Sequence, residues 1–97
     1  MNPDTFLQLD KVIHEKSRMA IMSMLAGSSE LSFTQLRNSL KMTDGNLTTH
    51  IRTLQKSGYV VVSKRFNENR PLTTCKLSAS GIRAFSDYIS LLERIVK

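Results

Sequence analysis

Residues 44–57 place small, hydroxyl and basic side chains at helical spacing on one side of an expected helix. Four residues at spacings of four, three and four share that side of a helical wheel: Gly45, Thr49, Arg52 and Lys56. The opposite side is apolar and is expected to be buried: Leu47, Ile51 and Leu54. No acidic residue follows Asp44 in this segment, whereas a solvent-exposed helix often pairs Glu with Lys. The pattern favours a helix face that meets a polyanion over an ordinary solvated face.

The same face offers side chains that can distinguish DNA bases. Arginine bonds guanine O6 and N7 together, asparagine bonds adenine, and threonine bonds a base edge or touches the methyl group of thymine. The major groove of DNA is wide enough to admit one α-helix. We therefore expect four residues to contact bases: Asn46, Thr48, Thr49 and Arg52.

Other residues of the same region suit the DNA backbone. Free N–H groups at a helix start favour a phosphate, and a glycine there permits close approach. Asp44 repels phosphate and is not counted as a contact. We expect backbone contacts from six residues: Thr34, Gly45, Lys56, Lys64, Arg65 and Arg70. For Lys64, Arg65 and Arg70 the alternative interpretation is that they belong to an ordinary solvated turn, which also contains Glu68.

Local signals predict the elements that position these residues. Ser32 and Gln35 fit a capping box that begins a helix at about residue 33, and Thr43 can cap a second helix after a three-residue break. Gly58 is suited to end that helix. Two runs rich in apolar and β-branched residues, 59–66 and 72–77, then predict a β-hairpin, with the polar stretch 67–71 as the turn between them. The expected order is a helix-turn-helix at about 33–57 and a wing at about 59–77.

Helices are also expected at both ends of the chain, at about 4–14 and 79–96. The last helix carries two adjacent apolar stripes, a face wider than one small core needs. Either the second stripe merely covers the first helix, or the two terminal helices form a dimer interface, which is the interpretation we favour. The expected interface residues are mainly apolar: Phe6, Leu7, Leu9, Ile13, Tyr88, Leu91, Leu92 and Ile95.

Length and charge limit the possible fold and partners. The 97 residues fit one domain, 1–97, that is mainly α with a small β-hairpin, an α+β class. The formal net charge of +6 belongs to residues 31–78, where eight Lys and Arg face two Asp and Glu. Residues 1–30 carry a net −1 and residues 79–97 a net +1. A basic centre of this kind is typical of binding to a polyanion, although a basic surface kept for solubility would also produce it.

No pattern in the sequence indicates an enzyme, a metal site or a cofactor. A glycine-rich phosphate loop and a triad-like setting of Ser, His and Asp are both missing. Asp10 and His14 are four residues apart but have no third ligand nearby, so no metal is expected. The single cysteine, Cys75, suits a buried strand position and a reducing cytosol. We see no secretory signal and no apolar run of membrane-spanning length, and expect a cytoplasmic protein at the nucleoid with no membrane partner.

Several stretches resemble small prokaryotic winged helix-turn-helix regulators. The most similar is Met42-Thr43-Asp44-Gly45-Asn46-Leu47-Thr48-Thr49-His50-Ile51-Arg52-Thr53-Leu54, closed by Gly58-Tyr59-Val60. Phe33-Thr34-Gln35-Leu36-Arg37 and Arg70-Pro71-Leu72-Thr73-Thr74 are similar too. Over about residues 9–96 the chain resembles the multiple-antibiotic-resistance-type and arsenical-repressor-type regulators.

This resemblance implies a protein that binds operator DNA as a homodimer and dimerises through its terminal helices. Two departures from the family pattern stand out. The last helix begins at Ser78 without the proline and glutamate that these proteins often carry. The cysteine pairs that bind metal in arsenical repressors are absent, which argues against a metal sensor of that kind.

Two classes of function follow from the sequence. The leading prediction is a homodimeric, sequence-specific transcriptional regulator of double-stranded DNA, with a palindromic operator as its site. Its recognition helix would enter the major groove and its wing would contact the backbone or the minor groove. The alternative is a winged-helix module that binds proteins and no longer binds DNA. A third possibility is RNA binding or general binding to chromosomal DNA.

Overall fold

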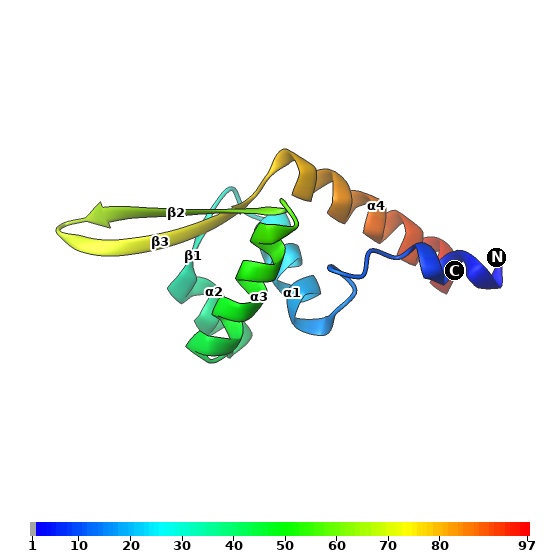
Figure 1. Cartoon of the computed structure of the whole chain (residues 1–97), viewed down its shortest axis with the longest axis horizontal. Helices are drawn as coiled ribbons and strands as arrows, with labels where there is room; N and C mark the ends of the chain where they lie inside the picture. The colour runs from blue at the N-terminus through cyan, green and yellow to red at the C-terminus, as the bar shows by residue number, and fades with distance from the viewer. Residues whose placement is uncertain (1) are drawn as a thin grey trace.

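The structure is a computed structural model that describes residues 2–97 (Figure 1). Over this range it contains four α-helices, a short 3-10 helix and a three-stranded antiparallel sheet. The chain order is η1 (Pro3–Gln8), α1 (Lys16–Ala26), β1 (Leu31–Ser32), α2 (Phe33–Leu40), α3 (Asp44–Lys56), β2 (Val60–Asn67), β3 (Arg70–Leu77) and α4 (Ala79–Val96). The mainly helical fold with a small sheet confirms the predicted fold class, a winged helix-turn-helix.

Side-chain caps begin the helices at the residues that the sequence indicated. The capping box before α2 is complete, because Gln35 N donates to Ser32 Oγ at 3.0 Å and Ser32 N donates to Gln35 Oε1 at 2.8 Å. Thr43 Oγ1 accepts from Asn46 N at 3.1 Å at the start of α3. Ser78 Oγ accepts from Gly81 N at 2.9 Å at the start of α4. The helices predicted from these signals are therefore confirmed.

The end of α3 is a Schellman motif that turns the chain into β2. Gly58 has a φ of 80°, in the left-handed region that glycine adopts at little cost. Gly58 N donates to Gln55 O and Tyr59 N donates to Leu54 O, both at 3.0 Å, which satisfies carbonyls left free by the helix end. The predicted stop at Gly58 is confirmed.

The hairpin is longer and tighter than the sequence suggested. Val60 pairs with Leu77 and Asn67 pairs with Arg70, so only Glu68 and Asn69 form the turn. Both have positive φ, 55° and 65°, as a two-residue turn of type I′ requires. The polar stretch 67–71 was expected to lie between the strands, but residues 67, 70 and 71 belong to them. Sequence analysis also missed β1, a two-residue strand that pairs with β3 at Cys75 and Thr74.

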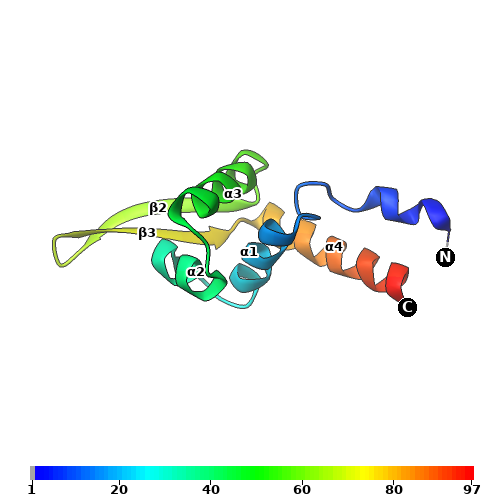
Figure 2. The ribbon, with the colours of Figure 1, turned by 90° about the horizontal axis from the view of Figure 1, so that it is seen from below.

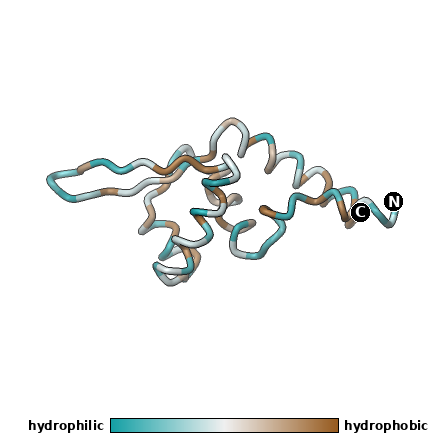
Figure 3. Tube along the Cα trace, viewed as in Figure 1, coloured by the Kyte–Doolittle hydropathy of each residue, from teal (hydrophilic) through white to brown (hydrophobic). Residues whose placement is uncertain are grey.

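The core lies where α1, α2 and α3 pack against the sheet and the start of α4. Its fully buried members are apolar: Ile13, Ile21, Met22, Leu25, Leu36, Leu47, Leu54 and Cys75. The molecule is elongated, 54 × 25 × 21 Å, with the wing at one end and both chain ends at the other (Figures 1 and 2). Figure 3 shows the chain apolar where the strands approach the helices and hydrophilic at the wing tip.

The helix predicted over about 4–14 is wrong in kind and extent. Asn2 Oδ1 accepts from Asp4 N and begins a 3-10 helix that ends at Gln8. The chain then turns, because Asp10 Oδ1 accepts from Val12 N at 2.8 Å and from Ile13 N at 3.1 Å. An aspartate that bonds nearby N–H groups in this way offers the backbone an alternative to the helix. Tyr59 O–H also donates to Asp10 Oδ2, and this hydrogen bond raises the pKa of Tyr59 to about 12.

Three residues assigned to a dimer interface lie inside the protomer instead. Ile13 is completely buried, and Tyr88 and Leu91 are 2% and 8% exposed. Tyr88 shares a hydrogen bond with His14 Nδ1 at 2.8 Å and donates to Met19 Sδ at 3.3 Å. The apolar stripe of α4 that holds Tyr88 and Leu91 packs on the N-terminal segment of its own chain, which explains the error.

Candidate nucleic-acid interface

Helix α3 presents a polar, basic face to solvent. Its apolar side is buried against the core through Leu47, Ile51 and Leu54, as predicted. This packing leaves five of the predicted DNA-contacting residues exposed: Gly45, Asn46, Thr49, Arg52 and Lys56. Thr48 is half-buried at the edge of this face, and Thr34 is exposed in the first turn of α2. Both helices of the helix-turn-helix therefore contribute to one accessible surface.

Two of the three threonines of α3, Thr49 and Thr53, have their hydroxyl protons engaged by the helix backbone. Thr49 Oγ1 donates to Gly45 O at 2.9 Å, and Thr53 Oγ1 donates to Thr49 O at 3.2 Å. Such bonds leave each hydroxyl only its lone pairs for an outside partner. Thr49 can therefore accept from the amino group of adenine or cytosine, or touch a thymine methyl with its own methyl group.

An ion pair neutralises the acidic residue at the start of α3. Arg37 Nη1 on α2 donates to Asp44 Oδ1 at 2.9 Å. Within residues 2–97 no ion pair involves Arg52, Lys56, Lys64 or Arg70. These four cations are therefore available to an outside anion. The negative charge of Asp44, which would repel such an anion, is balanced by Arg37.

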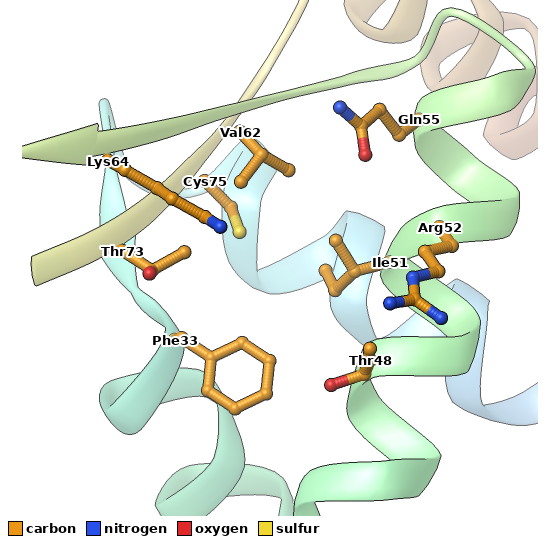
Figure 4. Close-up of a pocket in the computed structure, with 9 residues that line it drawn as sticks. All are labelled: Phe33, Thr48, Ile51, Arg52, Gln55, Val62, Lys64, Thr73 and Cys75. Carbon is orange, nitrogen blue, oxygen red and sulfur yellow. The ribbon is translucent and has the colours of Figure 1, made fainter.

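A hollow of about 520 Å³ separates α3 from the hairpin (Figure 4). Thr48, Ile51, Arg52 and Gln55 line it from α3, and Val62, Lys64, Thr73 and Cys75 line it from the strands. Phe33 at the start of α2 closes one side. The hollow brings Arg52 and Lys64 to the same concavity although they lie on different elements. Sequence analysis missed Phe33, Gln55 and Thr73 here, but the alternation of strand side chains would have placed Thr73 on the face of Cys75.

Arg65 has a structural partner that the sequence did not reveal. Its guanidinium donates to Glu30 Oε1, and Thr74 Oγ1 donates to the same oxygen. Hydrogen bonds from Thr74 and then from Arg65 hold the pKa of Glu30 below its ordinary value. Glu30 immediately precedes β1, so this cluster ties the wing to the helical body. Arg65 makes these bonds through Nη2, and its side chain is still 54% exposed. Lys64 and Arg70 are exposed as well.

A second polar cluster holds α3 on α1. Arg18 Nε donates to Val12 O at 2.6 Å, and Arg18 Nη1 lies 3.3 Å from His50 Nδ1 on α3. Glu15 caps α1 by accepting from Arg18 N at 2.8 Å. Burial raises the pKa of Glu15, but the N–H groups of Arg18 and Ser17 and the nearby His50 and Arg18 side chains bring the pKa below its ordinary value. His50 is half-buried in this cluster.

Exposed apolar residues gather at the end opposite the wing. η1 packs against α4, yet Phe6 and Leu7 are 55% and 66% exposed and Val96 is 72% exposed. Of the other residues predicted to form a dimer interface, Leu9, Leu92 and Ile95 are half-buried. Leu9 and Leu92 pack against the core cluster of their own chain.

Neither a metal-ligand cluster nor a membrane-spanning helix occurs among the described residues. No three His, Cys, Asp or Glu side chains come together within residues 2–97. None of the helices described over this range is long and apolar enough to cross a membrane.

Comparison with known proteins gives two sequence matches. Residues 17–96 match the family described as winged helix DNA-binding domain. The chain is also 33% identical over 79 residues to an uncharacterized protein of Methanocaldococcus jannaschii, covering 81% of this chain and 86% of that protein.

Solved structures share the fold. A transcriptional regulator homologue from Pyrococcus horikoshii OT3 superposes with a TM-score of 0.89 and is 26% identical, covering 99% of this chain and 95% of the other. A protein assigned to the MarR family of transcriptional regulators, from Enterococcus faecalis V583, gives a TM-score of 0.75 at 24% identity and covers 90% and 86% of the two chains.

Proposed function

The chain belongs to the family of winged helix DNA-binding domains, and from this premise we propose that it is a sequence-specific transcriptional regulator of double-stranded DNA. The observation that carries the proposal is the surface formed by α3 and the wing. It brings together around one hollow two cations from different elements, Arg52 and Lys64, which form no ion pair within residues 2–97. A helix flanked by a basic ribbon suits a major groove with a phosphate row beside it.

Base and backbone contacts divide along α3 and the wing. We assign base contacts to Asn46, Thr48, Thr49 and Arg52, with Arg52 bonding a guanine. Backbone contacts fall to Thr34, Gly45, Lys56, Lys64 and Arg70. Arg65, held by Glu30 and Thr74 through Nη2, orients the wing and can also donate to a phosphate from its other N–H groups.

The proposed assembly is a homodimer on a palindromic operator. The exposed apolar residues of η1 and α4 offer a surface that a second copy could cover. Two recognition helices about 34 Å apart would then read successive major grooves on one side of the duplex. Such a regulator works at the nucleoid, in the cytoplasm.

A titration with mixed-sequence duplex DNA at low and at high salt tests DNA binding. Because cations that neutralise phosphates release counterions, log affinity should fall linearly with log salt. Absence of salt-dependent binding would instead favour the protein-binding module that the sequence left open. Equal affinity for single-stranded RNA would favour RNA as the natural ligand.

Selection of bound duplexes from a random pool, followed by two variants, tests the division of roles. Arg52→Ala should cost about 1–3 kcal/mol on the selected site and relax specificity at one base pair. Arg70→Ala should weaken binding to all duplexes alike and lower the salt slope by about 1, because one phosphate is no longer neutralised. If both variants bound selected and random DNA with equally reduced affinity, the assignment of Arg52 to a base would be wrong.

A further inference from the structure

The wing tip carries an aromatic side chain that is largely exposed to solvent. Phe66 is 78% exposed, more than Leu7 or Val96. Burying a phenylalanine side chain is worth a substantial favourable free energy, and here that gain is unused. Phe66 belongs to β2 of the wing, and the wing lies at the end of the molecule opposite η1 and the C-terminal end of α4 (Figure 1).

The turn geometry sets what lies beside Phe66. Glu68 and Asn69, both with positive φ, fix the register in which Phe66 pairs directly with Pro71. Side chains of directly paired residues lie on the same face of an antiparallel ribbon, close enough to touch. The tip therefore presents an apolar pair, a benzene ring next to a pyrrolidine ring.

This pair faces the same way as the hollow beside α3. Strand side chains alternate between faces, so Phe66 shares its face with Lys64 and Val62, and Pro71 shares its face with Thr73 and Cys75. All four of those neighbours line the hollow and point towards α3 in Figure 4. A duplex held against α3 and Lys64 would thus meet Phe66 next, about 7 Å further along the ribbon.

The charges around the pair identify the class of partner. Lys64 precedes it on the same face, Arg70 adjoins Pro71, and neither takes part in an ion pair within residues 2–97. Glu68 in the turn is the one acidic residue of the tip. An apolar wedge flanked by cations matches the minor groove, where proteins insert Phe or Pro between base pairs while basic side chains hold the phosphates.

We propose that Phe66, supported by Pro71, inserts into the minor groove adjacent to the major groove occupied by α3 and partly unstacks a base step there. The inference rests on the proposed function and adds a determinant of specificity to it. Pyrimidine–purine steps such as TA unstack most easily, so the wing should favour such a step at its position without any hydrogen bond to a base.

The test compares the wild type with three variants of the hairpin on a mixed-sequence duplex that carries 2-aminopurine at its TA steps. Phe66→Ala should weaken binding roughly tenfold or more, leave the salt slope unchanged because no charge is removed, and abolish the rise in 2-aminopurine fluorescence that reports unstacking. Phe66→Leu should retain most of both signals, because leucine also serves as a wedge. Val61→Ala is the matched control, since Val61 lies on the opposite face of the same strand and is 40% exposed.

The outcomes separate this inference from the proposed function. Salt-dependent binding by the wild type, together with an unchanged affinity and fluorescence for Phe66→Ala, overturns the inference alone. Complete absence of duplex binding by the wild type overturns the proposed function and the inference with it. A change in molar mass of Phe66→Ala in light scattering would place Phe66 in a contact between copies of the chain and would also overturn it. Circular dichroism checks that each variant is folded.

Discussion

Arg37 on α2 donates a hydrogen bond to Asp44 in the first turn of α3, with 2.9 Å between Arg37 Nη1 and Asp44 Oδ1. Asp44 is 70% exposed at its side chain and favours the helix start electrostatically, but it lies where a phosphate would approach. The pair lets α3 keep its acidic first turn without repelling DNA. Because both partners are partly exposed, its contribution to folding is small, on the order of 0–1 kcal/mol.

Arg37→Ala should therefore weaken DNA binding more than it destabilises the fold. The uncovered carboxylate would repel phosphate, and we expect affinity to fall by a few-fold to about tenfold at low salt. Asp44→Asn in the same chain should restore the affinity, since it removes the charge that Arg37 balances. Anisotropy titrations of the two single variants and the double variant measure this coupling. An equal fall in affinity for Arg37→Ala with and without Asp44→Asn would show that Arg37 contacts DNA itself.

Gly45→Ala should separate stability from DNA binding. A Cβ built at Gly45 has nothing within 4 Å, so alanine fits the folded chain. Replacing a helical glycine should raise the free energy of unfolding by about 0.4–1 kcal/mol. The same methyl group would stand between the helix start and a phosphate, so affinity for DNA should fall. Gly27→Ala is the control, because its Cβ would also meet only ordinary contacts and Gly27 lies outside the proposed interface.

Leu7→Glu should produce a monomer if η1 and α4 form the dimer surface. Leu7 is 66% exposed, so the charge costs little within the protomer but would be buried at the contact between two copies. Light scattering should give half the wild-type mass, with circular dichroism and thermal midpoint little changed. Ser28→Glu, an exposed position away from this surface, should keep the wild-type mass. The same substitution at Leu91 would test folding instead, because Leu91 is buried.

Cys75 should be inert in the folded protein at neutral and mildly alkaline pH. Burial, with the nearby charge of Glu30 as a second cause, raises the pKa of the thiol from 9.0 to about 11. The thiolate is the reactive form, so alkylation by iodoacetamide at pH 8 should be about a hundredfold slower than in the urea-unfolded chain. The thiol of Cys75 holds its proton more tightly in the folded than in the unfolded chain. The thiol therefore stabilises the fold below pH 9, and this stabilisation is lost as the pH rises towards 11. Equal alkylation rates in the folded and unfolded chain would contradict the burial of this strand.

Gly81→Ala should destabilise the fold strongly. A Cβ at Gly81 would lie 2.1 Å from Tyr59 O, a backbone atom that cannot swing aside. The same junction is tied by Ser78 N, which donates to Tyr59 O at 3.0 Å, and by Ser78 Oγ, which donates to Gly58 O at 2.5 Å. We expect the free energy of unfolding in urea to fall by about 1–3 kcal/mol or more. An unchanged midpoint would mean that α4 can shift away from β2 at no cost.

Much of the fold and part of the candidate site could be predicted from short-range patterns. The caps at Ser32, Thr43 and Ser78 and the stop at Gly58 act over three to five residues, so their signals lie within a few positions of the chain. The buried side of α3 follows from helical periodicity, and so does the acid-free exposed side that carries Arg52 and Lys56.

The tertiary structure decided what depends on residues distant in the chain. Arg65 meets Glu30 across 35 positions, and Tyr59 meets Asp10 across 49, so no local pattern shows that either side chain is engaged. The apolar stripe of α4 could equally have covered a neighbouring chain, and only its packing on the N-terminal segment places Ile13 and Tyr88 in the core. Sequence by itself determined the helix-turn-helix and its charge, because backbone capping and side-chain periodicity are local. The cations that remain available to DNA are decided by long-range packing, and the strand face that Phe66 shares with Lys64 is decided by strand register. Only the folded chain defines either of them.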